Sequence, residues 1–211
     1  MTPENDIPEA SYALLASGAN FSCEVMQALL QRHHPPTVVI LPEFAPAQNS
    51  IQSDRDLLSS APYRRLLALS KGISTAYAPA AQQADCARFI EQNKIDFLLI
   101  ACWPYLIDSV LIDSARKAAV NMHPSLLPNY RGPNPVEQQL AAHEPRPGVT
   151  LHLLNQHFDQ GDIIAQAELE DLDTKPDRLT LERYCAELGV TLFIDALARY
   201  NLGWKRIPQR V

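Results

Sequence analysis

Two polar side chains stand close together where an apolar segment ends near the middle of the chain. The run Ala118–Met122 has the composition of a buried strand, and a proline follows Asn121-Met122-His123. Side chains alternate across a strand, so Asn121 and His123 point to the same side. An asparagine amide is a fixed N–H donor, and an imidazole donates or accepts a proton near neutral pH. The pair indicates a polar site, although a loop-capping histidine beside an asparagine that satisfies the backbone fits as well.

The elements that would position this pair alternate between short β-rich runs and longer stretches of helical period. That alternation predicts βαβ units, and hence an α/β, Rossmann-like, doubly wound and mostly parallel sheet. In such a sheet ligands bind outside the carboxyl ends of the strands, which is where Asn121 and His123 fall. The expected strands are Tyr12–Ala16, Thr37–Leu41, Ile73–Tyr77, Phe97–Cys102, Ala118–Met122, Val149–Leu154 and Ile163–Leu169. The expected helices are Ser22–Arg32, Asp54–Ser70, Ala80–Asn93, Ile107–Lys117, Val136–Ala142 and Leu179–Tyr200, and Glu43–Ser60 reads as a long surface loop.

Length and composition limit the classes of protein to which the chain can belong. With 211 residues, 46% of them hydrophobic, the chain suits one packed α/β domain. Its net charge of -6 opposes broad binding to a phosphate backbone. No apolar run approaches the roughly 20 residues that span a bilayer. The first ten residues carry acids where a signal peptide carries lysine or arginine, so we expect a cytoplasmic protein without a membrane partner.

The remaining polar motifs do not predict a metal or a dinucleotide. The four cysteines are widely spread and form no C-x-x-C pair, so we expect reduced, mostly buried thiols. His143 and His157 have no partner at a metal-ligand spacing, and we expect no metal. The turn Ser17–Ser22 opens a helix, a position that suits a phosphate or a ribose. Its single glycine is far from G-x-G-x-x-G, which argues against a dinucleotide.

A longer motif surrounds the Asn121–His123 pair. The stretch N-M-H-P-S-L-L-P-N-Y-R-G-P-N-P begins at Asn121, G-V-T-L-H covers Gly148–His152, and F-D-Q-G-D-I-I-A-Q covers Phe158–Gln166. Together they resemble the 10-formyltetrahydrofolate-dependent formyltransferase family, and most closely the catalytic domain of its methionyl-tRNA and sugar-nucleotide branches. The resemblance extends more weakly over the whole chain, so it implies that residues 1–211 form a single formyltransferase catalytic domain. It also implies a catalytic trio of Asn121, His123 and Asp159.

The implied chemistry explains these residue types. A neutral amine that attacks a formyl carbon creates a tetrahedral intermediate with an oxyanion and a positive nitrogen. Asn121 and His123 would stabilise the oxyanion, each good donor contributing about 3–4 kcal/mol. Asp159 would orient His123, raise its pKa and relay a proton through water from the amine to the leaving nitrogen. The formyl donor, by the same resemblance, is 10-formyltetrahydrofolate.

The resemblance assigns the folate to two loops. One follows the strand Phe97–Cys102, and the other leads from Asn155 into Asp159. Stacking on the ligand is open to the aromatic side chains in the first loop, but ordinary packing is the better account of them, and a packed histidine is the better account of His152. The residues expected to bind folate are Trp103, Tyr105, Leu106, Asn155, Gln156 and His157.

The acceptor stays open at this point. Leu188 stands near the place where the purine-pathway branch has a glutamate, which argues against that branch. The chain lacks residues for the C-terminal tRNA-binding domain of the methionyl-tRNA enzymes, so tRNA is a disfavoured partner. We expect a small amine, for example an amino-sugar nucleotide. The alternatives are a 10-formyltetrahydrofolate hydrolase, a methionyl-tRNA formyltransferase-like enzyme and a folate-binding module without turnover, and the sequence leaves a homodimer open.

Overall fold

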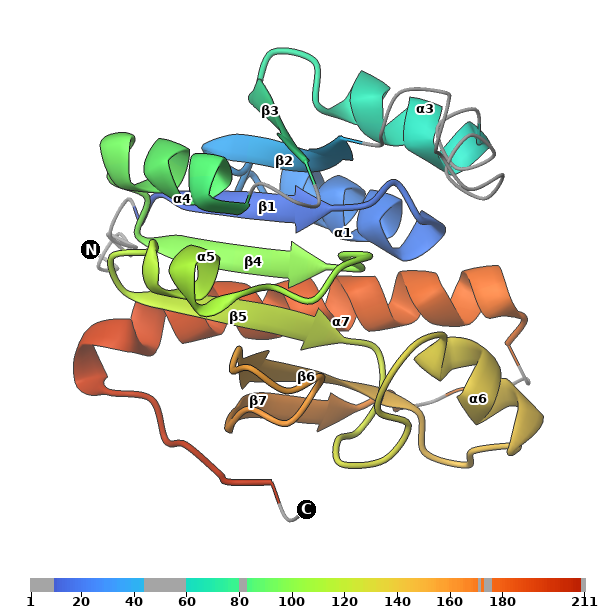
Figure 1. Cartoon of the computed structure of the whole chain (residues 1–211). Helices are drawn as coiled ribbons and strands as arrows, with labels where there is room; N and C mark the ends of the chain where they lie inside the picture. The colour runs from blue at the N-terminus through green and yellow to red at the C-terminus, as the bar shows by residue number, and fades with distance from the viewer. Residues whose placement is uncertain (1–9, 44–59, 80–82, 171, 173–175, 210–211) are drawn as a thin grey trace, which may run out of the picture.

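A seven-stranded sheet forms the centre of the protein, with the strand order β3-β2-β1-β4-β5-β6-β7 (Figure 1). The computed structural model describes residues 10–43, 60–79, 83–170, 172 and 176–209. Strands β1 to β5 are parallel, whereas β6 and β7 are antiparallel to their neighbours. The expected α/β, Rossmann-like, mostly parallel architecture is therefore confirmed. The strands are β1 Tyr12–Ala16, β2 Val38–Glu43, β3 Ser74–Pro79, β4 Phe97–Ala101, β5 Ala118–His123, β6 Gly148–Leu153 and β7 Ile163–Glu168.

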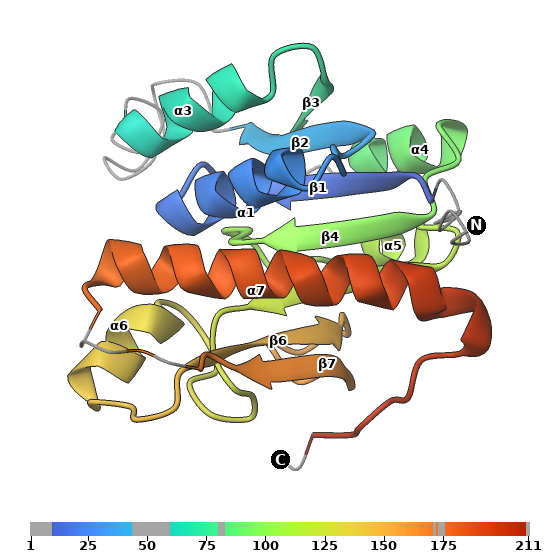
Figure 2. The ribbon, with the colours of Figure 1, turned by 180° about the vertical axis from the view of Figure 1, so that it is seen from behind.

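Helices cover both faces of the sheet. Helices α1 and α7 lie on one face, which Figure 2 shows from the front, and α4 and α5 lie on the other (Figure 1). Helix α3 packs against α1, and α6 lies near the beginning of α7. The helices are α1 Asn20–Gln31, α3 Ala61–Leu69, α4 Gln83–Gln92, α5 Ser109–Asp113, α6 Pro135–Ala141 and α7 Arg178–Arg199, and a short 3-10 turn, Tyr200–Leu202, follows α7.

The two faces of the sheet carry separate apolar clusters. The larger one joins the sheet to α1 and α7, and the smaller one joins it to α4 and α5. Every residue of β1 and of β4 is buried, which explains why Y-A-L-L-A and F-L-L-I-A are apolar throughout rather than alternating. Both central strands are thus held from two sides, and their carboxyl ends are fixed relative to β5.

Helix α7 approaches β5 closely at Gly189. A Cβ atom at this position would lie 2.5 Å from the Met122 sulfur, so the absence of a side chain sets the spacing between helix and strand. Met122 lies between Asn121 and His123 and faces the larger cluster. Glycine at 189 therefore lets the helix support the strand directly behind the polar pair.

Most helices differ from the expected bounds by one to three residues, and α5 and α3 differ further. Helix α5 was expected over Ile107–Lys117 but spans only Ser109–Asp113. The chain leaves the helix early because the Arg116 amide donates to the Ile95 carbonyl and the Lys117 amide to that of Asp96, which leads directly into β5. Helix α3 begins at Ala61 because the Ser60 side chain caps the amide of Tyr63. The expected helical residues 54–59, and residues 44–59 of the expected loop, lie outside the described residues, while Glu43 ends β2.

Within the described part of the chain, none of the helices combines the length and the apolar character needed to cross a membrane.

Candidate functional site

The carboxyl end of β5 presents Asn121 and His123 on one face of the sheet. Ala119, two positions earlier in the strand, packs into the cluster with α4 and α5, so the alternation places both polar side chains on that same face. His123 is 4% exposed, and Asn121 is partly buried. The predicted pair thus forms a largely buried polar site at the edge where the parallel strands end.

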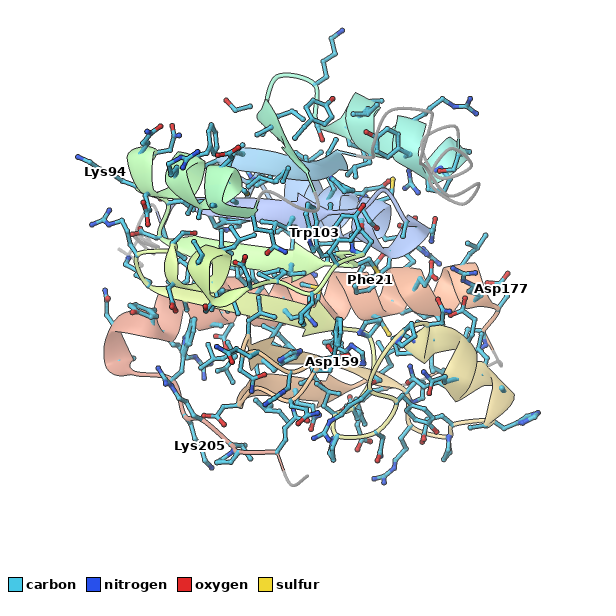
Figure 3. All side chains as sticks on the ribbon, viewed as in Figure 1. Phe21, Lys94, Trp103, Asp159, Asp177 and Lys205 are labelled. Carbon is cyan, nitrogen blue, oxygen red and sulfur yellow. The ribbon has the colours of Figure 1, made fainter. Side chains whose placement is uncertain are left out.

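Asp159 comes to this edge from the turn between β6 and β7. Its backbone is left-handed, with φ at 53°, which is uncommon for a residue other than glycine. The turn then presses against β6, because a Cβ on Gly161 would lie 1.7 Å from the Leu153 carbonyl oxygen. Figure 3 labels Asp159 just beyond the end of β5, and Trp103 farther up the sheet, level with β1 and β4. The strained turn projects the carboxylate towards Asn121 and His123.

The Asn121 carboxamide joins two groups of the site. Its Nδ2 donates to Asp159 Oδ1 over 3.1 Å and lies 3.0 Å from His152 Nε2. His152 Nδ1 lies 2.9 Å from the Leu153 carbonyl, which can only accept, so Nδ1 carries the proton of a neutral ring. His152 Nε2 then accepts from Asn121. Both hydrogens on Asn121 Nδ2 are therefore held by the protein.

His123 is fixed through its other ring nitrogen. Its Nε2–H donates to the Tyr130 carbonyl over 3.0 Å, which leaves Nδ1 facing Asp159 Oδ1 at 3.6 Å. That separation exceeds a direct hydrogen bond. The second carboxylate oxygen of Asp159 accepts from the Gly132 amide over 2.9 Å. The structure thus brings the predicted trio of Asn121, His123 and Asp159 together, and the Tyr130–Gly132 segment holds two of its members.

Burial and charge set the protonation states of the site. Burial lowers the pKa of His123 below 6.5, and the neighbouring Asp159 carboxylate and the Tyr130 carbonyl oppose this only in part. Asp159 was expected to raise the pKa of His123; it does so, but burial outweighs it. Burial also raises the pKa of Asp159, but the hydrogen bond from the Gly132 amide and the neighbouring His152 and His123 rings outweigh it, and the pKa lies below 3.8. At neutral pH the site holds a neutral imidazole and an ionised carboxylate.

The residues expected to bind folate occupy two loops beside β5. The Trp103 ring packs against the cluster of α4 and α5, and it meets Tyr105 edge-on at 6.2 Å between ring centroids. The indole Nε1 of Trp103 is buried and has no hydrogen-bond partner. Leu106 is 48% exposed, and its carbonyl accepts from the Gln83 side chain. After β6, Asn155, Gln156 and His157 are exposed in a turn in which Asn155 Oδ1 accepts from the amide of His157.

The sequence did not assign several groups that hold the trio. His152, for which packing was the favoured interpretation, is fully buried but also accepts a hydrogen bond from Asn121. Its place in G-V-T-L-H, directly across from Asn121 in the antiparallel register, is the signal that could have identified this contact. Tyr130 and Gly132 act through backbone atoms, which no residue type reveals.

A charged cluster lies along the same edge of the sheet, at the beginning of α7. Glu182 is buried and accepts from Asn20 Nδ2 at 2.7 Å and from Arg178 Nε at 2.9 Å. Arg178 also pairs with Glu137 at 2.8 Å. The protein atoms around the Cys102 thiol raise its pKa, and the carboxylates of Glu182, Glu137 and Asp159 raise it further. The Arg178 charge opposes them and lowers that pKa, so the Cys102 thiol lies within electrostatic range of both the cluster and the trio.

A hollow of about 670 Å³ lies apart from the trio, between α7 and the segment after β7. Its lining includes Arg32, Tyr184 and Leu188 but no member of the trio.

Among the residues that the structure describes, no three histidine, cysteine, aspartate or glutamate side chains gather as metal ligands. Of the four free thiols, Cys23, Cys86 and Cys185 are buried and Cys102 is exposed.

Residues 13–197 match the sequence model of the formyl transferase family, and this range includes the whole trio. The chain belongs to the formyl transferase family. It is 26% identical to the methionyl-tRNA formyltransferase of Colwellia psychrerythraea over 186 residues, which cover 87% of this chain and 54% of that protein. It is 30% identical to the Chloroflexus aggregans enzyme of the same name over 149 residues, or 71% of this chain and 48% of that protein. The chain therefore spans about half the length of these relatives.

Solved structures confirm the formyltransferase fold. The glycinamide ribonucleotide transformylase 1 of Symbiobacterium toebii superposes with a TM-score of 0.67 at 18% identity, covering 95% of this chain and 94% of that one. A sugar N-formyltransferase from a Shewanella species superposes with a TM-score of 0.63 at 17% identity, covering 95% of this chain and 74% of that one. Neighbours with different acceptors thus share this fold, and the fold alone does not select an acceptor.

Proposed function

We propose that the protein transfers the formyl group of 10-formyltetrahydrofolate to the primary amine of a small acceptor, with residues 1–211 acting as a catalytic domain. The observation that carries the proposal is the contact of Asn121 with Asp159 beside the buried His123, in a chain of the formyl transferase family. These are the residue types that acyl transfer to an amine requires: an N–H donor, a neutral imidazole and a carboxylate.

The protonation states favour attack by a neutral amine. As the amine nitrogen bonds to the formyl carbon it becomes positive, and the ionised Asp159 stabilises that charge. The released proton is drawn to the space between His123 Nδ1 and Asp159 Oδ1, since a lone pair and a carboxylate oxygen face each other there at 3.6 Å. The folate N10 takes up a proton as its bond to the formyl carbon breaks, which balances the transfer.

Asn121 would stabilise the oxyanion through Nδ2. Its hydrogens already point to Asp159 Oδ1 and His152 Nε2, so the oxyanion competes with these acceptors. A proton gained by Asp159 weakens that carboxylate as an acceptor and makes the Asn121 hydrogen available. Proton release from the amine and stabilisation of the oxyanion are therefore coupled through one carboxylate.

The loops after β4 and β6 are the proposed folate site. The buried indole N–H of Trp103 needs an acceptor, and Leu106 and Phe158, which are 48% and 61% exposed, offer apolar surface. A flat heterocycle with ring acceptors meets both requirements. Trp103, Tyr105, Leu106, Asn155, Gln156 and His157 would hold the donor, and the bound folate would supply the activated formyl carbon.

A small acceptor is favoured over tRNA on electrostatic grounds. The net charge is -6, and carboxylates outnumber cations in the cluster of Glu137, Arg178 and Glu182. Such surroundings attract an amine and repel a chain of phosphates.

The decisive experiment offers labelled 10-formyltetrahydrofolate together with amino-sugar nucleotides, other small amines and methionyl-tRNA at physiological salt. We expect label on a small amine, release of tetrahydrofolate only when that amine is present, and none of either with His123→Ala. Label on tRNA alone would overturn the choice of acceptor. Release of tetrahydrofolate without any amine would identify a hydrolase, and folate binding without release or transfer would identify a binding module.

A further inference from the structure

A residue far along the chain holds the turn that carries Asp159. Gln209 Nε2 donates to the carbonyl of Asp159 over 2.9 Å and to that of Gly161 over 2.7 Å. Its Oε1 accepts from Arg131, over 3.1 Å from Nε and 2.7 Å from a terminal nitrogen. Every hydrogen-bonding group of this carboxamide is thus used, and its three partners, Asp159, Gly161 and Arg131, belong to the segments that form the site.

These contacts close a loop of hydrogen-bonded residues around the Asp159 carboxylate. Arg131 lies between Tyr130, whose carbonyl accepts from His123, and Gly132, whose amide donates to Asp159 Oδ2. Gln209 connects Arg131 with the backbone of Asp159, and the Gly132 amide connects the same segment with the Asp159 side chain. The position of the carboxylate relative to His123 therefore depends on both connections.

The segment that carries Gln209 is itself anchored beside β7. Ile207 and Ile163 exchange two backbone hydrogen bonds of 2.9 Å, so the chain after α7 adds an isolated antiparallel bridge to the sheet. Gln209 follows two positions later. The sheet edge thus fixes the starting point from which the side chain reaches the turn.

The backbone of Asp159 needs such support. A left-handed aspartate is a conformation that persists only where its surroundings determine it. Hydrogen bonds to the carbonyls of Asp159 and Gly161 hold the turn on both sides of the left-handed residue. Without them the turn can relax, and the carboxylate moves with it.

We propose that Gln209 is a positioning residue, which acts through Asp159 and Arg131 to set the carboxylate beside His123 and Asn121. It does not touch the reacting atoms. The consequence for the reaction rests on the proposed function, whereas the consequence for the electrostatics of His123 does not.

The test compares Gln209→Met, which keeps the length of the side chain but removes its hydrogen bonds, with Gln209→Glu. Gln92→Leu, an exposed substitution on α4, is the control. We expect Gln209→Met to lower kcat by roughly 10²-fold with little change in KM, because small displacements of a catalytic group have effects of that size. Gln209→Glu should not restore the rate, since a carboxylate cannot donate to two carbonyls. Gln92→Leu should behave as wild type.

An NMR titration of His123 provides a readout that needs no turnover. Asp159 raises the pKa of His123, so displacement of the carboxylate should lower that pKa in Gln209→Met but not in Gln92→Leu. Circular dichroism should show an unchanged fold in all variants. An unmoved His123 pKa in a folded Gln209→Met protein would overturn the proposal, whatever its kcat. A lowered pKa in a protein that shows no transfer even as wild type would support the positioning role and count against the proposed reaction alone.

Discussion

The side chain of Asn121 donates to the carboxylate of Asp159 over 3.1 Å across 38 positions of sequence. The acceptor at the other hydrogen of the same amide is His152, at 3.0 Å. The asparagine is therefore both a donor for the proposed oxyanion and a tether for the carboxylate, and the two roles can be separated by substitution.

Replacement of Asn121 by aspartate keeps the shape of the side chain and removes both N–H donors. It also places a second carboxylate beside Asp159. We expect kcat to fall by about 10²–10³-fold, the usual effect of losing one oxyanion donor, with a smaller effect on the affinity for folate. Steady-state formyl transfer with a fixed acceptor measures this. A variant with more than a tenth of the wild-type rate would contradict the role given to Asn121.

His123 should titrate below pH 6.5, since burial is the largest influence on its pKa and Asp159 opposes it. Asp159→Asn removes the opposing charge and should move the pKa lower still. The acid limb of kcat/KM should follow, because a protonated His123 cannot accept a proton from the amine. Histidine NMR of both proteins checks the sign, and a pKa that rises in Asp159→Asn would show that the Asp159 carboxylate does not raise the pKa of His123.

Stability should fall in two steps as the pH decreases. The pKa of His123 in the folded protein lies below 6.5, so the unfolded chain binds more protons, and stability is lost as the pH drops through 6.5 towards the folded value. The pKa of Asp159 is also depressed, so its contribution is present above 3.8 and is lost only as the pH falls through the lower folded value. Urea denaturation across this range measures both steps. His123→Asn should remove the first step and retain the second.

His152→Phe should affect stability as well as turnover. His152 is fully buried, and the substitution removes the partner that its ring provides to the Leu153 carbonyl and to one hydrogen of Asn121. We expect a loss of about 1–3 kcal/mol in the free energy of unfolding and a reduced kcat. Chemical denaturation and steady-state kinetics provide the two numbers, with His143→Phe as the exposed control. Wild-type values for both would remove His152 from the network.

A reduced folate should stabilise the folded protein. At a free concentration one hundred times its Kd, a ligand of the native state adds about 2.7 kcal/mol. Trp103→Phe retains a ring but lacks the buried N–H, so it should show a smaller shift in Tm at equal folate concentration. NAD should give no shift with either protein. An unchanged folate response in Trp103→Phe would assign the loop after β4 to packing alone.

The sequence was sufficient for the strands of the buried sheet because their residues are apolar on both faces, as in Phe97–Ala101. It was less informative for α5, because the helical pattern of apolar residues continues beyond the end of the helix. The amides of Arg116 and Lys117 donate instead to the backbone just before β4. The Asn121–His123 pair followed from alternation. The place of Asp159 came from resemblance, since its left-handed turn has no local signature. Gln209 lay beyond prediction because its contact with Asp159 spans 50 positions and depends on the sheet edge.

The glycine at 189 has a consequence for protein engineering. A glycine within a helix is ordinarily an attractive target, since alanine gains about 0.5–1 kcal/mol in such a position. Here the added methyl group would meet the Met122 sulfur at 2.5 Å, on the strand that carries Asn121 and His123. An engineering screen that scored only helix propensity would select Gly189→Ala. The substitution would displace Met122, and with it the strand that positions Asn121 and His123, although residue 189 contacts neither of them.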